Sequence, residues 1–120
     1  MKEETFEFYR GTTYSRDFTL TGWSLSIEKM YFTVKEDIND KNPVLQKKLG
    51  DGITLVSEED GAKTFNILID ATDTDGMKTD FDYAFDIKII SPGVEEEIKD
   101  VVLTGVLRLT GSATAVYNEN

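Results

Sequence analysis

Hydrophobic residues alternate with polar ones along most of this chain, and this period of two constrains the fold more than any other feature. In the run 29–35, for example, Met30, Phe32 and Val34 share one parity. The same alternation recurs in the runs 5–9, 14–20, 64–69, 82–89 and 101–110. Successive side chains of a β-strand point to opposite faces, so each run has one face for a core and one for water. The pattern therefore predicts an all-β chain of antiparallel sheets, each covered on one face.

Short polar segments rich in turn-forming residues separate these runs. They lie at 21–22, 39–43, 50–52, 59–61 and 91–93. Short strands with such frequent breaks are typical of a β-sandwich or a small barrel. Asp60-Gly61 predicts a hairpin turn between two of the strands. Because the chain has 120 residues and shows no internal linker, we expect one domain over 1–120 with a short polar tail at 117–120.

Two residue types that carry much of protein chemistry are missing. The chain contains no cysteine and no histidine. This excludes a disulfide framework, thiolate ligation of metals, and any catalytic arrangement of the Ser-His-Asp or Cys-His kind. Carboxylates are so numerous that some pair will have the spacing of a glycosidase by chance alone. We therefore expect no enzyme and no cofactor.

The charge balance narrows the possible partners. Thirteen basic and 23 acidic residues give a formal net charge of −10. Nucleic-acid binding requires a basic face, and anionic membranes repel an acidic protein, so we expect neither partner. No apolar run approaches the ~20 residues that span a bilayer, and no signal-peptide core follows Met1. The expectation is a protein made in the cytoplasm.

Aspartates gather in the segment between residues 70 and 82. Calcium takes six to eight oxygen ligands, which Asp-rich loops with a glycine commonly supply. The candidate calcium ligands are Asp73, Asp75 and Asp82. The alternative is that 70–77 forms a capped helical turn or a solvated loop, since Asp and Thr are good N-caps.

Two aromatic residues are candidates for contact with sugars. An exposed ring offers a flat apolar face on which a sugar can stack. Trp23, which follows Gly22 just outside a run, and Tyr31 are the residues in question. The alternative is that these rings pack in the core or shield a sheet edge. Exposure of both on one face, beside Asp or Asn side chains, would favour glycan binding.

Gly105 interrupts the last alternating run. A glycine inside a strand has no side chain to pack, and it commonly marks a β-bulge or a close approach of another backbone. We expect one of these two structural roles at Gly105, rather than a functional one.

Four groups of stretches, in chain order, resemble a family of small β-domain proteins from phages and prophages of Gram-positive bacteria. They are 6–11 with 16–20, 30–35 with 43–47 and 52–53, 69–74 with 83–87, and 102–105. The resemblance is to the N-terminal domain of the phage baseplate upper protein family. It implies an immunoglobulin-like sandwich, and it brings no catalytic residues.

The function implied by the pattern and the resemblance is a non-catalytic structural or adaptor module of a virion tail or baseplate. It would act through protein–protein contacts at strand edges and one face. The expected partners are other virion proteins or further copies of the chain, since symmetric homo-oligomers are common. The protein would be made in the bacterial cytoplasm and become virion-associated. A carbohydrate- or cell-surface-binding module, which depends on Trp23 and Tyr31, is the alternative.

Overall fold

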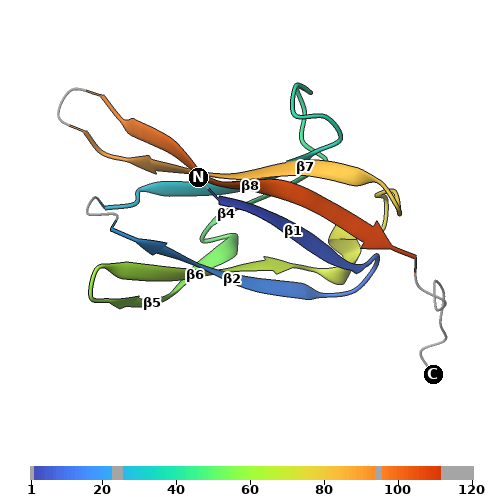
Figure 1. The fold of residues 1–120 in the computed structure, drawn as a ribbon, viewed down its shortest axis with the longest axis horizontal. Helices are drawn as coiled ribbons and strands as arrows, with labels where there is room; N and C mark the ends of the chain where they lie inside the picture. The colour runs from blue at the N-terminus through green and yellow to red at the C-terminus, as the bar shows by residue number, and fades with distance from the viewer. Residues whose placement is uncertain (1, 23–25, 94–95, 112–120) are drawn as a thin grey trace.

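The structure is a computed structural model that describes residues 2–22, 26–93 and 96–111. Eight strands and one short 3₁₀ turn make up the described chain (Figure 1). They are β1 (Lys2–Tyr9), β2 (Tyr14–Thr21), β3 (Lys29–Lys35), β4 (Leu45–Leu49), β5 (Gly52–Glu59), β6 (Ala62–Ile69), the turn η1 (Ala71–Thr74), β7 (Asp82–Ser91) and β8 (Ile98–Thr110). Every alternating run of the sequence is a strand, so the all-β prediction is confirmed.

The strands form one hydrogen-bonded order, β1-β8-β7-β3-β4-β5-β6-β2, which folds over between β4 and β5. Figure 1 shows the result as two layers, with β7 and β8 above and β5, β6 and β2 below. We call β1-β8-β7-β3-β4 the five-stranded layer and β5-β6-β2 the three-stranded layer. Among the described residues, strand pairing joins one layer to the other at two parallel residue pairs, Lys48 with Gly52 and Leu49 with Ile53.

This connectivity is that of an immunoglobulin-like sandwich. In immunoglobulin domains, strands B, E and D share one sheet, and strands C′, C, F and G share the other. When β2 is taken as strand B, β6 and β5 fall in the places of E and D, and β4, β3, β7 and β8 fall in the places of C′, C, F and G. The expected sandwich is confirmed, with one correction: pairing is not purely antiparallel, because β1 runs parallel to β8 and β4 runs parallel to β5.

The centre of the core is aromatic. Phe6, Phe32 and Phe85 are buried, and the Phe85 ring centroid lies 4.5 Å from that of Phe6 and 5.3 Å from that of Phe32. Such ring pairs contribute about 0.5–1.5 kcal/mol beyond the area that they bury. Antibody domains join their layers with a disulfide packed against a tryptophan. This chain has no cysteine, and packed rings from β1, β3 and β7 occupy its centre.

Tyr83 ties the connection before β7 to the core. Its side chain is buried, and its Oη accepts a hydrogen bond from the Lys78 backbone N–H at 2.7 Å. A tyrosine near the start of strand F that bonds to the backbone a few residues upstream is the tyrosine corner of immunoglobulin-like domains. Phe85 follows two residues later, where antibody domains have their second cysteine.

Two local predictions are confirmed at single residues. Asp60 and Gly61 turn β5 into β6 with φ of 46° and 79°, and positive φ at both central positions is what a type I′ hairpin turn requires. At Gly105, a Cβ would collide with the Glu4 carbonyl oxygen and the Phe85 ring. The missing side chain therefore allows β1 to approach β8 closely.

Candidate functional site

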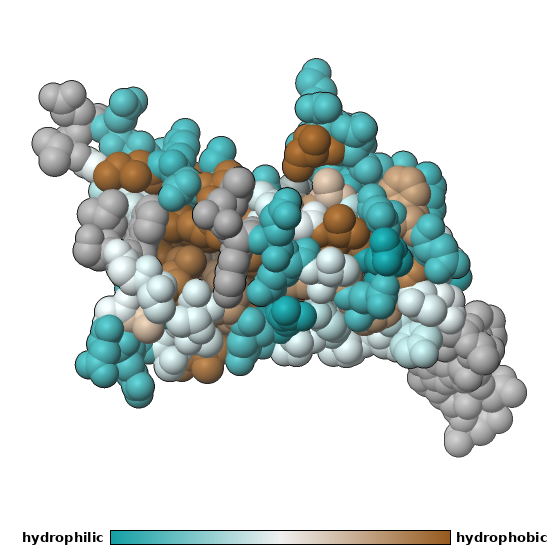
Figure 2. Space-filling model, viewed as in Figure 1, coloured by the Kyte–Doolittle hydropathy of each residue, from teal (hydrophilic) through white to brown (hydrophobic). Residues whose placement is uncertain are grey.

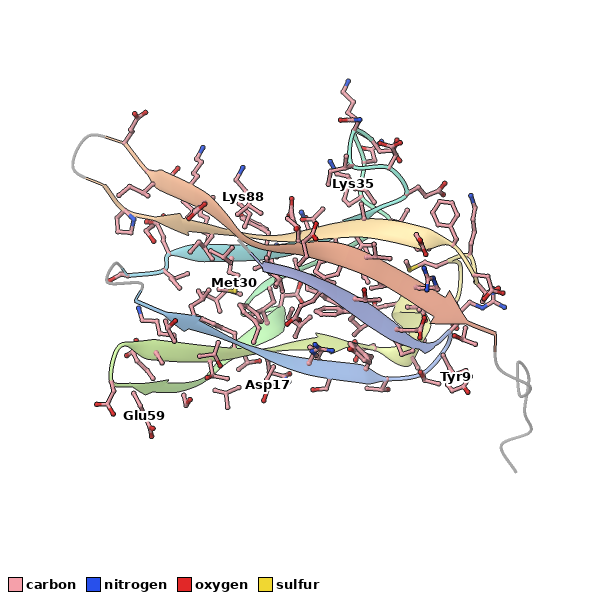
Figure 3. All side chains as sticks on the ribbon, in the orientation of Figure 1. Tyr9, Asp17, Met30, Lys35, Glu59 and Lys88 are labelled. Carbon is pink, nitrogen blue, oxygen red and sulfur yellow. The ribbon has the colours of Figure 1, made fainter. Side chains whose placement is uncertain are left out.

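A groove of about 470 Å³ lies on the outer face of the five-stranded layer, beside the connection from β3 to β4. Its position follows from the alternation along β3, because Met30, Phe32 and Val34 face the core and leave the intervening side chains outside. Figure 3 shows this arrangement: Met30 lies between the layers, while Lys35 and Lys88 project from the opposite face of their layer.

The floor of the groove is built from neighbouring strands in register. Thr33 of β3 stands between Gln46 of β4 and Asp86 of β7, and Tyr31 stands beside Lys88 of β7. The Gln46 Nε2 donates a hydrogen bond to Thr33 Oγ1 at 3.0 Å. An amide, a hydroxyl, a carboxylate and an aromatic ring therefore face the same space.

Asp86 is the acidic residue of the groove. Its half-buried position raises the pKa of its carboxyl above the ordinary value, while Lys88 and Lys35 nearby act in the opposite direction. A titratable group in a cleft with burial and specific charge partners is a candidate for a functional role.

Lysines give this groove a sign opposite to that of the protein. Among the described residues that line it, Lys35, Lys41, Lys88 and Lys99 stand with one acid, Asp86, and together they carry a formal charge of +3. The whole chain carries −10. None of the ion pairs between described residues uses these four lysines. The positive charge of the groove is therefore not neutralised by ion pairing within the part of the chain that the structure describes.

The connection between β3 and β4 forms one wall and is held in shape by its own hydrogen bonds. The Asp37 backbone N–H donates to Asp40 Oδ2 at 3.1 Å, and the Asn39 N–H donates to Asp37 Oδ1 at 2.9 Å. Lys35 Nζ donates to the Asp40 carbonyl oxygen at 2.7 Å. Lys41 follows this turn and lines the groove.

Of the two predicted sugar contacts, Tyr31 is half-buried on the groove floor, with part of its ring accessible. It therefore neither packs in the central core nor lies fully exposed. Trp23 lies outside the described residues, so exposure of both rings on one face stays a prediction.

The predicted calcium ligands have other contacts. The Asp73 carboxylate accepts a hydrogen bond from the Asp70 backbone N–H at 2.7 Å and pairs with Lys47 Nζ, also at 2.7 Å. Asp82 accepts a hydrogen bond from Arg108 Nε at 2.6 Å. Asp75, at the end of the same turn, lies near Gly11. Across the residues that the structure describes, no three carboxylates gather at metal-binding distance, and we do not propose calcium binding.

The segment of these aspartates has a structural role instead. Ala71–Thr74 is the single helical turn that the sequence left as an alternative. Thr74 is buried, and its Oγ1 accepts a hydrogen bond from the Gly11 N–H at 2.8 Å. This bond fixes the turn to the connection between β1 and β2.

A second surface is the edge of β5 that faces away from β6. β4 covers this edge only at Gly52 and Ile53. Beyond them, Leu55 and Val56 are 47% and 56% exposed. The segment 54–57 contains no charged residue, so this edge has apolar side chains and lacks the charges that commonly prevent pairing with another strand. Its pairing with β6 shifts register between Leu55 and Ser57.

The edge of β2 is different. It carries Asp17 on its outer face, and Arg16 on its inner face pairs with Glu4 of β1 at 3.1 Å. Inward-pointing charges are a common protection of edge strands. Beside β2, a gap of about 220 Å³ is lined by Phe18, Leu20 and Val102, among others. Figure 2 shows apolar surface on this side of the molecule, toward the left of the view.

Sequence reasoning missed the groove lysines as a group. Lys35 and Lys88 stand at outward positions of two alternating runs, which was the available signal. The sequence did not reveal that these runs are neighbours, or that a connection would place Lys41 beside them.

Comparisons with known proteins leave the family open. No family model and no curated protein matches the chain. One similar solved structure is that of the extracellular domain of the voltage-gated sodium channel beta4 subunit, whose parallel homodimers are described as explaining its role in cell–cell adhesion. The identity is 12% and the TM-score 0.39, with 93% of this chain and 94% of that chain covered. A likeness at this level supports no inference about function. Among the described residues, no helix has the length and apolar character needed to span a membrane.

Proposed function

We propose that the chain is a non-catalytic module that acts through protein–protein contacts, as a structural or adaptor component of a phage or prophage tail or baseplate. The observation that carries the contact mechanism is the open edge of β5 with exposed Leu55 and Val56. Unpaired backbone groups on an edge bind an added strand, and apolar side chains anchor it. The assignment to a virion rests on the resemblance of the four groups of stretches, and the genes beside this one test it: tail genes support it, and their absence counts against it.

A second copy of the chain is the partner that the β5 edge suits. Two β5 strands paired antiparallel about Val56 would place Leu55 opposite Ser57 and Thr54 opposite Glu58. No like charges face each other in that register, and facing like charges are what destabilise strand pairs. A twofold contact of this kind is the commonest form of homo-oligomer.

The experiment is sedimentation over a range of concentrations for the wild type, Val56→Lys and Thr19→Lys. We expect the wild type and Thr19→Lys to associate and Val56→Lys to remain monomeric, because a charge at the centre of the paired edge opposes pairing. Thr19 is the matched control, since it is an exposed position on the protected edge of β2. A wild type that stays monomeric and binds no product of a neighbouring gene would refute the proposal.

A carbohydrate-binding function is the second candidate, and Tyr31 on the floor of the groove favours it. Its ring is accessible beside Asp86 and Gln46, which are hydrogen-bonding side chains that sugars commonly contact. A glycan array tests this candidate independently of sedimentation.

A further inference from the structure

The groove concentrates positive charge on an acidic protein. Four lysines from β3, β7, β8 and the β3–β4 connection line it together with one half-buried aspartate. Like charges held close together raise the free energy of the folded state, and a bound anion lowers it. The rest of the chain, with its large acidic excess, repels anions, so this face is where a negatively charged ligand is favoured.

Asp86 restricts what kind of anion fits. The carboxylate of Asp86 would repel a bare inorganic anion at the centre of the groove. It would not repel a ligand with hydroxyl groups, because a hydroxyl can donate a hydrogen bond to that carboxylate. Thr33 and Gln46, in the same row as Asp86, offer further polar atoms to hydroxyl groups. The groove therefore suits a molecule with hydroxyls at its centre and negative charge at its lysine rim.

The backbone of the floor argues against an acidic peptide. β3 is paired with β4 on one side and with β7 on the other, and β7 is paired with β3 and β8. No strand edge is open there for a peptide to add to, and strand addition is how extended peptides commonly gain affinity for sheets. Recognition on this face depends on side chains, and Tyr31 supplies a ring surface suited to a sugar.

We propose that this groove binds an acidic saccharide, meaning a sugar that carries a carboxylate or phosphate group. Its size of about 470 Å³ lies in the range of small-molecule sites, roughly 300–1,000 Å³. The sugar ring contacts Tyr31, its hydroxyls bond to Asp86 and Gln46, and its anionic group lies among Lys35, Lys88 and Lys41. This inference rests on the carbohydrate-binding candidate and adds the charge of the ligand.

The test is an array of oligosaccharides in matched pairs, in which each uronate, sialic acid or sugar phosphate is printed beside its neutral counterpart. We expect binding to acidic members only, with competition by the same free oligosaccharides and none by tetraglutamate. Lys88→Gln and Tyr31→Ala should each weaken binding about tenfold. Lys63→Gln, which removes the same charge from the three-stranded layer, should leave it unchanged, and thermal unfolding of each variant reports whether it folds.

Asp86→Asn distinguishes a specific saccharide site from a surface that binds through positive charge alone. The substitution raises the charge of the groove, so a purely electrostatic site would bind the acidic saccharide more tightly. A site in which Asp86 accepts hydroxyl hydrogen bonds would bind it about tenfold more weakly. Tighter binding overturns the assigned role of Asp86.

The remaining outcomes are distinct. Equal binding of neutral and acidic members overturns the anionic inference and leaves carbohydrate binding intact. No binding to any glycan overturns both. Competition by tetraglutamate, or acidic binding that Lys88→Gln and Tyr31→Ala leave unchanged, overturns the saccharide site in this groove.

Discussion

The two long sides of this sandwich differ in what joins the layers. Between β4 and β5, backbone pairing carries the chain from one layer to the other, and the Lys47–Asp73 ion pair adds to it. Between β1 and β2, described residues join the layers through side chains: Arg16 pairs with Glu4, and the Phe8 and Tyr14 rings stack with centroids 4.2 Å apart.

The way in which the layers are joined affects how easily each side opens. Backbone pairs fix the register of neighbouring strands, whereas side-chain contacts break one at a time. Segments with fewer buried contacts and unpaired edges open first in native proteins. We therefore expect the β1–β2 side to be the less stable of the two, and the following variants test that comparison.

The largest effect is expected from Phe6→Ala. The Phe6 ring is buried, and its neighbours are the rings of Phe32 and Phe85 and the guanidinium of Arg16. Truncation of a buried phenylalanine lowers the free energy of unfolding by about 3–5 kcal/mol. Urea denaturation measures this loss. The comparison is Leu49→Ala, at a half-buried residue of β4, on the side where backbone pairing joins the layers. A loss at Leu49 equal to that at Phe6 would contradict the larger contribution of the aromatic centre of the core.

Gly105→Ala should have the next largest effect. The new Cβ meets the Glu4 carbonyl oxygen, so β1 must move away from β8, and overpacking of this kind costs about 1–3 kcal/mol. Gly111→Ala is the control, because its nearest neighbour would be Thr79 at 4.0 Å. Hydrogen exchange of β1 amides gives the local readout: faster exchange in Gly105→Ala and unchanged exchange in Gly111→Ala.

The two ion pairs should differ by a smaller amount. The side chains of Lys47 and Asp73 are 12% and 22% exposed, and those of Arg16 and Glu4 are 38% and 23% exposed. Double-mutant cycles should give a coupling of about 1 kcal/mol for the first pair and about 0.5 kcal/mol for the second. Added salt should weaken the second more, since solvent screens it better. A larger coupling for Arg16–Glu4 would reverse the comparison.

The smallest effect on stability is expected from the ionisation of Asp86. Its contribution changes with pH, so it must be known before the ion pairs are compared at different pH values. Burial raises the pKa of its carboxyl above the ordinary 3.8. The folded state then holds the proton to higher pH than the unfolded chain, so stability from this group falls as pH rises from about 3.8 through the raised pKa. Relative to the wild type, Asp86→Asn should gain a little stability over this interval. If the urea midpoint of the wild type instead rises relative to that of Asp86→Asn over this interval, the raised pKa of Asp86 is refuted.

Much of the fold could be predicted because alternation acts within single strands. The buried parities of 29–35 and 82–89 are those that the sequence indicated, and the Asp60-Gly61 turn and the glycine at 105 follow from local backbone rules. The immunoglobulin-like order was implied by resemblance rather than by alternation, since a period of two says which face a residue occupies and nothing about which strands are neighbours.

Most of the candidate site could not be predicted from the sequence, because alternation does not say which strands are neighbours. Lys35 and Lys88 are 53 positions apart in the sequence, and they line one groove because β3 pairs with β7. The candidate calcium aspartates are the converse case: they are close in sequence, but Asp73 and Asp82 pair with Lys47 and Arg108 from other strands. Tyr31 could be identified because the alternation within its own strand already shows that its ring points outward.

The β5 edge is tested most directly by hydrogen exchange of the wild type at two protein concentrations, one dilute and one at which it associates. We expect amides among residues 54–57 that point away from β6 to exchange freely when dilute and to be protected on association. Protection that appears on β2 instead, or association with no change at 54–57, would contradict the assignment of this edge as the contact surface.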